Sequence, residues 1–120
     1  MKILVAEDEQ LMLKVLEMRL KKEGYEVIGC SDGREALQHI DAEMPDMIIT
    51  DIMLPYSSGL EIVGHVKQTR GAKIPIIVLS AMGQEKTVEE AFLLGADDYV
   101  TKPFSLNELA IRIKKLTKAV

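Results

Sequence analysis

Short apolar runs alternate along this chain with longer stretches that mix apolar and polar residues. The runs have the length and composition of β-strands, and we expect strands near residues 2–7, 25–30, 47–51, 75–80 and 98–101. The longer stretches carry apolar residues at helical spacing, and we expect helices near 9–22, 33–43, 58–69, 85–94 and 106–118. The third and fourth runs are apolar at successive positions, which is typical of central strands covered by helices on both faces.

Residues at the ends of the predicted helices support these boundaries. Three pairs have the spacing of a capping box, and a glycine follows the first helix: Asp32 with Glu35, Ser58 with Glu61, Ser105 with Glu108, and Gly24. Leu11, Val15 and Met18 share one face of the first predicted helix. The alternation predicts an α/β fold: a flavodoxin-like, doubly wound five-stranded parallel sheet with five helices and right-handed crossovers.

The composition is that of an ordinary globular domain. Of the 120 residues, 48% are hydrophobic and 28% are charged, and we expect a single domain spanning residues 1–120. The net charge of −4 disfavours direct nucleic-acid binding, which needs clustered Lys and Arg. No apolar run approaches the roughly 20 residues of a membrane span. Cys30 is the only cysteine, so no internal disulfide can form, and we expect a cytoplasmic location.

Polar side chains follow four of the predicted strands at the point where each strand ends. Glu7 and Asp8 follow the first strand, Asp51 ends the third, Ser80 ends the fourth, and Lys102 follows the fifth. The carboxyl ends of parallel strands meet at one edge of the sheet, where α/β proteins bind ligands. Mg²⁺ prefers oxygen ligands, and an aspartate carboxylate can attack phosphorus as a nucleophile. The pattern therefore predicts a magnesium and phosphoryl-transfer site, with Asp8 and Asp51 as direct ligands and Glu7 acting through a water.

Each of these residues also has a simpler interpretation when it is taken alone. Asp51 could cap a turn, and the two acids after the first strand could favour the dipole of the following helix. Ser80 and Lys102 could lie in solvated turns. Their joint occurrence at equivalent strand ends favours a site, and the main-chain carbonyl of Met53 is a further candidate ligand.

Five segments form a more specific combination than any one of these residues does. They are Glu7-Asp8, Asp51 through Gly59, Ser80-Ala81, Gly95 through Tyr99, and Lys102-Pro103-Phe104. With these segments the chain resembles, over essentially its whole length, the receiver domain of two-component response regulators. The resemblance implies that a histidine kinase or phosphotransfer protein donates a phosphoryl group to Asp51, with Mg²⁺ held by Glu7, Asp8, Asp51 and the Met53 carbonyl. It also implies a phosphoacceptor signalling domain that catalyses only its own phosphotransfer and slow autodephosphorylation.

The resemblance further implies a conformational switch. Ser80 is expected to move toward the phosphate, Tyr99 to change rotamer with it, and the Lys102–Pro103 bond to be cis. A phosphoryl group adds roughly 1.5 to 2 negative charges and three strong acceptors. Ser80 and Lys102 are donors that can satisfy those acceptors, and the phosphate would thereby bias one of two packing arrangements.

Two methionines suggest a property of the phosphorylated form. Met53 lies two residues after Asp51, and Met82 lies two residues after Ser80. Neither side chain can orient an attacking water by hydrogen bonding, so we hypothesise a comparatively long-lived aspartyl phosphate. The simpler interpretation is that methionines fill irregular gaps.

The last segment carries Asp97-Asp98-Tyr99 together with Glu108 and Arg112. With these residues it resembles receivers of the winged-helix transcription-factor branch, which dimerise through their fourth helix, fifth strand and fifth helix. We expect a phosphorylation-dependent homodimer through residues 85–118, with Asp98 pairing to Arg112 across it. The chain departs from that branch in the fourth helix, where residues 87–91 carry no basic residue and Leu93-Leu94 replaces a more polar pair.

Three other functions fit parts of the pattern. A magnesium-dependent phosphatase with an aspartyl nucleophile would place a second acid at position 53, which is Met53 here. A flavin- or nucleotide-binding module would carry a Gly-, Ser- or Thr-rich loop where this chain has acids at 7–9. A receiver-like domain that signals by protein contact without phosphorylation stays open as a third alternative.

Three other residues with reactive side chains have no predicted role. Cys30 ends the second strand and is expected to be a small core residue. His39 and His65 have no second ligand or base at a useful spacing in the sequence. We expect both histidines to be at least partly exposed, and neither is a candidate phosphodonor.

Overall fold

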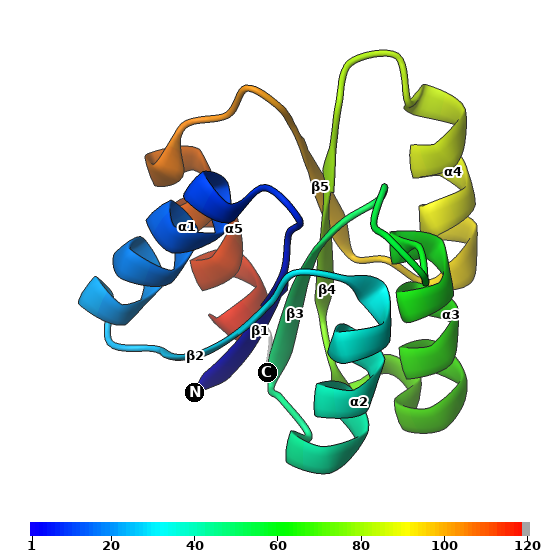
Figure 1. The fold of residues 1–120 in the computed structure, drawn as a ribbon, viewed down its shortest axis with the longest axis horizontal. Coiled ribbons are helices and arrows are strands. Elements are labelled where there is room, and N and C mark those ends of the chain that lie inside the picture. Colours follow the sequence, from blue (N-terminus) through cyan, green and yellow to red (C-terminus); the bar gives the residue numbers. More distant parts are fainter. Residues whose placement is uncertain (119–120) are drawn as a thin grey trace.

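The computed structural model describes residues 1–118 as one parallel sheet between two layers of helices (Figure 1). The strands are β1 (Lys2–Ala6), β2 (Glu26–Cys30), β3 (Met47–Asp51), β4 (Ile76–Ser80) and β5 (Asp98–Thr101). The helices are α1 (Gln10–Lys22), α2 (Gly33–Glu43), α3 (Gly59–Arg70), α4 (Glu85–Leu94) and α5 (Leu106–Lys118), with a 3₁₀ turn, η1 (Gly71–Lys73). The strand order β2-β1-β3-β4-β5 is all parallel, which confirms the predicted flavodoxin-like fold, and each predicted boundary agrees to within one residue.

Alternating residues of each strand supply the two halves of the core. In β1, Ile3 and Val5 face the layer formed by α1 and α5, whereas Leu4 and Ala6 face α2, α3 and α4. Figure 1 shows these two helical layers on opposite faces of the sheet. Every residue of β3 and β4 is buried, which is the arrangement predicted for central strands of a doubly wound sheet.

Helix α1 packs through a different face from the one that the sequence pattern suggested. Leu16 and Leu20 are buried against the sheet, whereas Leu11 and Met18 are each 72% exposed. The helix carries two apolar stripes, and helical periodicity alone does not say which of them meets the sheet. The stripe of Leu11, Val15 and Met18 therefore lies on the surface of the described part of the chain.

The predicted helix ends are present in the structure. The backbone N–H groups of Glu35, Glu61 and Glu108 donate to the side chains of Asp32, Ser58 and Ser105 at 2.7, 3.2 and 3.0 Å respectively. Gly24 follows α1 with φ of +95°, a left-handed conformation that glycine adopts without strain. The Lys102–Pro103 bond is cis, as predicted. Among residues 1–118, no helix has the length and apolar character needed to cross a membrane.

Candidate functional site

The acids predicted to act together meet at the carboxyl edge of the sheet. Strand pairing sets Ala6 beside Thr50, so that Glu7 and Asp51 leave neighbouring strands at the same level. One carboxylate oxygen from each of Glu7, Asp8 and Asp51 lies within 4.8 Å of the others. Glu7 is fully buried and Asp51 is 8% exposed, whereas Asp8 is exposed and leaves the cluster open to solvent. We call these three residues the acid pocket.

Lys102 reaches into the acid pocket from the end of β5. Its Nζ donates to Glu7 Oε1 at 2.6 Å and to Asp51 Oδ2 at 2.9 Å. Burial acts to lower the pKa of Lys102, but the hydrogen bonds and charges of Glu7 and Asp51 outweigh burial and leave that pKa raised. One ammonium against three carboxylates leaves two negative charges in the pocket, which favours binding of a divalent cation.

The backbone around Asp51 is held by close contacts that restrict its neighbours. The N–H of Gly59 donates to the Ile52 carbonyl at 2.8 Å, which folds the β3–α3 loop back onto the end of β3. A Cβ added to Gly59 would overlap the carbonyl oxygen of Asp51. The Thr50 hydroxyl donates to that same carbonyl oxygen at 2.9 Å. Glycine is therefore required at position 59 by the close approach of two backbone segments.

Ser80 and Tyr99 border an open pocket of about 480 Å³ beside the acid pocket. Ser80 is 1% exposed, and its Oγ lies 3.5 Å from the Thr101 hydroxyl. Tyr99 is 41% exposed and packs edge-on against Phe92, with ring centroids 5.7 Å apart. Phe92, Val88 and Tyr99 all line the pocket, so the space next to Ser80 is bounded by the α4 and β5 side chains.

The two methionines of the lifetime hypothesis lie in exposed loops at this edge of the sheet. Met53 is 63% exposed and Met82 is 80% exposed. Neither side chain fills a gap in the core, so the simpler interpretation of them as core-filling residues is wrong. The Met53 carbonyl follows Asp51 in the β3–α3 loop, and its role as a ligand stays a prediction.

Asp98 and Arg112 are already paired within one chain. Arg112 Nη1 donates to both carboxylate oxygens of Asp98 at 2.8 and 2.9 Å, and Arg112 Nη2 donates to Glu108 at 3.3 Å. The hydrogen bond and charge of Asp98 raise the pKa of Arg112. A pairing across a dimer would therefore have to exchange this internal pair for an intermolecular one.

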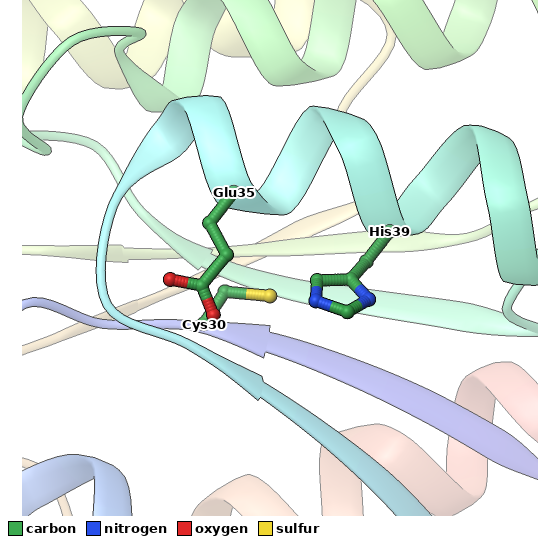
Figure 2. A group of neighbouring side chains, drawn as sticks. All are labelled: Cys30, Glu35 and His39. Atoms are coloured by element: carbon green, nitrogen blue, oxygen red, sulfur yellow. The ribbon is translucent and has the colours of Figure 1, made fainter.

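Sequence reasoning missed a second cluster of metal-ligating types. Cys30, Glu35 and His39 each offer one ligand atom, and these atoms lie within 4.8 Å of one another (Figure 2). The expectation that His39 has no second ligand nearby is therefore wrong. The sequence signal for this cluster was the i, i+4 spacing of Glu35 and His39, which sets both residues on one face of α2. That the Cys30 sulfur lies close to the Glu35 and His39 side chains became apparent only from the fold.

The sequence matches the family described as the response regulator receiver domain over residues 3–114. The chain therefore belongs to the receiver domain family of two-component response regulators, and it is a phosphoacceptor signalling module rather than a conventional enzyme. Receiver domains of this family work with a cognate histidine kinase. This result sets aside the phosphatase and the flavin- or nucleotide-binding alternatives.

Individual relatives agree with this assignment. The chain is 41% identical over 117 residues to the alkaline phosphatase synthesis transcriptional regulatory protein PhoP of Bacillus subtilis, covering 98% of this chain and 48% of that protein. The chain thus spans about half the length of this curated relative. The receiver domain of Francisella response regulator 1452 is 34% identical with a TM-score of 0.89, covering 98% of this chain and 97% of that one.

A third relative was crystallised with ligands. The response regulator TrrA of Thermotoga maritima, in complex with Mg²⁺ and BeF, is 35% identical with a TM-score of 0.85. The match covers 96% of this chain and 97% of TrrA.

Proposed function

We propose that Asp51 is the phosphoacceptor and that residues 1–120 form one receiver domain around it. The observation that carries this assignment is Lys102 Nζ, which bridges Glu7 Oε1 and Asp51 Oδ2 inside the acid pocket. Asp51 is the central carboxylate, because it ends the middle strand of the sheet and is 8% exposed. Exposure of that small extent leaves it accessible to a donor group while the rest of the strand stays buried.

The acid pocket has the donor chemistry that Mg²⁺ requires. Three carboxylates supply hard oxygen ligands, and the surplus of two negative charges matches the charge of the ion. We propose Glu7, Asp8, Asp51 and the Met53 carbonyl as the residues that hold it. The Mg²⁺ and BeF complex of TrrA supports Mg²⁺ as the ion. Bound Mg²⁺ would supply positive charge against the oxygens of the transferring phosphoryl group.

Phosphotransfer then follows from what the side chains can do. A carboxylate oxygen of Asp51 attacks the phosphorus of a phosphohistidine on the partner kinase, forming a P–O bond. The P–N bond breaks, and the imidazole of the partner leaves with the electron pair of that bond. Lys102 already contacts Asp51 and can donate to a phosphoryl oxygen after transfer, since lysine carries three donors on a flexible stem.

The switch uses the pocket beside Ser80. The Ser80 hydroxyl lies 3.5 Å from Thr101, a distance too long for a strong hydrogen bond, so little holds it away from an arriving phosphate. Movement of Ser80 toward the phosphate would enlarge the pocket of about 480 Å³ that Tyr99 borders. Tyr99 would then turn inward from its contact with Phe92, and α4 would repack.

Intact-mass analysis after incubation with Mg²⁺ and a small phosphodonor tests the assignment of Asp51. The wild-type chain should gain one phosphoryl group, and Asp51→Ala should gain none. Asp41→Ala is the matched control, because Asp41 is an exposed aspartate that pairs with His65 on the α2–α3 surface. The assignment of Asp51 is wrong if Asp51→Ala is still modified or if chelation of Mg²⁺ leaves the reaction unchanged.

A second proposal concerns a homodimer through residues 85–118. The surface of α4, β5 and α5 exposes apolar side chains, among them Leu93 at 87% and Ile111 at 67%. The name of the Bacillus subtilis relative, a transcriptional regulatory protein, supports a transcriptional output for such a switch. Leu93→Glu should abolish the dimer that forms with Mg²⁺ and BeF in sedimentation velocity. Leu11→Glu, at an apolar position of α1 that is 72% exposed, should leave it intact.

A further inference from the structure

A second group of ligating side chains lies on the α2 side of the sheet, apart from the acid pocket. Cys30 ends β2 and is fully buried in the core that α2 covers. Glu35 and His39 lie one turn apart on α2, and both are partly buried. Figure 2 shows both side chains directed toward Cys30, whose sulfur points at the His39 ring. The three ligand atoms lie within 4.8 Å of one another.

A fourth residue orients the imidazole of His39. The Nδ1 atom of His39 lies 2.6 Å from Glu43 Oε2, one turn further along α2. When Nδ1 carries the proton of this hydrogen bond, the lone pair of Nε2 is free to bind a cation on the side of Cys30. A carboxylate behind a histidine is the usual outer partner of a metal-binding imidazole, because it fixes the tautomer and raises the basicity of the ring.

The charge around the sulfur also favours a cation. The Cys30 thiol is buried, and the charged groups that act on it include the carboxylates of Glu35, Asp32 and Glu43. A metal ion would supply the positive charge that the surrounding acids lack.

We propose that Cys30, Glu35 and His39 form a binding site for a transition metal, with Zn²⁺ as the fitting ion and Glu43 as the outer partner of His39. A set of sulfur, nitrogen and oxygen donors favours Zn²⁺ over Mg²⁺, which prefers oxygen ligands. Ligand atoms around tetrahedral zinc are roughly 3.5 Å apart, so the three atoms, which lie within 4.8 Å of one another, would have to move closer together when the ion binds. Three protein ligands leave one coordination position for water.

The position of this site gives it a structural consequence. The Cys30 carbonyl accepts the N–H of Glu7 at 3.0 Å, and the Gly33 N–H donates to the Pro55 carbonyl at 3.0 Å. The short β2–α2 connection therefore contacts both loops that form the acid pocket. A metal ion that clamps the end of β2 to α2 would stiffen these two supports and raise the thermal stability of the chain.

Titration of the chain with Co²⁺, a spectroscopic substitute for Zn²⁺, tests the site. Because Cys30 is the only cysteine, any thiolate-to-cobalt charge-transfer band reports on this residue and not on the acid pocket. The wild-type chain should develop the band to saturation at one Co²⁺ per chain, and excess Zn²⁺ should remove it. Asp51→Ala should give the same band, which separates this site from the proposed phosphoacceptor.

Cys30→Ser, at a fully buried position, should lose the band. His39 and Glu43 are not buried, so variants at these two positions keep the test independent of core folding. His39→Ala should weaken Co²⁺ binding by at least about tenfold, and Glu43→Gln should weaken it by about tenfold. His65→Ala is the matched control, because His65 pairs with Asp41 at 2.9 Å but has no neighbouring thiol. The site is refuted if folded wild type shows no band at about 100-fold excess Co²⁺, or if His39→Ala binds as tightly as His65→Ala.

Discussion

Replacement of Lys102 by methionine tests how the acid pocket balances its charge. Lys102 makes two charge-assisted hydrogen bonds, to a fully buried Glu7 side chain and to an Asp51 side chain that is 11% exposed. Removing one partner of a buried ion pair costs about 3–5 kcal/mol, and the partial exposure of Lys102 sets the expectation at the lower end, about 3 kcal/mol. In a domain of this size that loss lowers the thermal midpoint by roughly 10 °C.

Magnesium should then stabilise the variant more than it stabilises the wild type. The lost ammonium no longer occupies oxygens of Glu7 and Asp51, and the surplus charge of the pocket rises by one. We expect Lys102→Met to bind Mg²⁺ about tenfold more tightly, which adds about 1.4 kcal/mol to the gain in the free energy of unfolding at saturating Mg²⁺. Urea denaturation with and without Mg²⁺ measures both effects on the same samples.

Lys67→Met is the matched control for this experiment. Lys67 also makes a partly buried pair, 3.1 Å from Asp97, but it lies between α3 and the β4–β5 edge, away from the acid pocket. Its loss should lower stability without any gain on adding Mg²⁺ beyond that of the wild type. If Mg²⁺ stabilises Lys102→Met no more than it stabilises Lys67→Met, the ammonium does not compete with the cation and the charge argument is refuted.

Three further predictions use other parts of the structure. Gly59→Ala should lower the free energy of unfolding by about 1–3 kcal/mol in urea melts. Gly64→Ala, at an open helical position, should raise the free energy of unfolding. Equal effects of the two substitutions would contradict the close approach of Gly59 to the Asp51 carbonyl. The hydrogen bond from Arg19 lowers the pKa of Glu23 from 4.5, so Glu23→Gln should lose measurable stability at pH 7, and this loss should shrink as the pH falls below 4.5. A loss that persists at pH 2 would contradict the pairing. Met82→Gln should shorten the half-life of the aspartyl phosphate measured by intact mass, and an unchanged half-life would count against the lifetime hypothesis.

The sequence predicted the fold well because its local signals agree with one another. Two strands with successive apolar residues, three capping pairs and Gly24 all indicated the same boundaries, and the structure places them within one residue. The convergence of Glu7, Asp51 and Lys102 was predictable because parallel strands deliver their ends to one edge. The packed face of α1 was not predictable, because two apolar stripes run along that helix and only the sheet selects between Leu16 and Leu11.

The features that the sequence did not predict depend on contacts between elements that pack against one another in the fold. The cluster of Cys30 and His39 depends on how α2 lies over β2, which no short-range pattern specifies. The pairing of Asp98 with Arg112 within one chain depends on how α5 crosses β5. The predicted cytoplasmic location is tested by no feature of the structure and stays a prediction.

The exposure of Met53 and Met82 has an evolutionary consequence. Both side chains lie in loops at the carboxyl edge of the sheet yet support none of the core, at 63% and 80% exposure. Substitutions at such surface positions usually change folding stability by less than about 0.5 kcal/mol. On the lifetime hypothesis, mutation at these two positions would adjust how long a signal persists while the scaffold stays intact, so the duration of a response would diverge between descendants of one ancestral protein faster than its architecture.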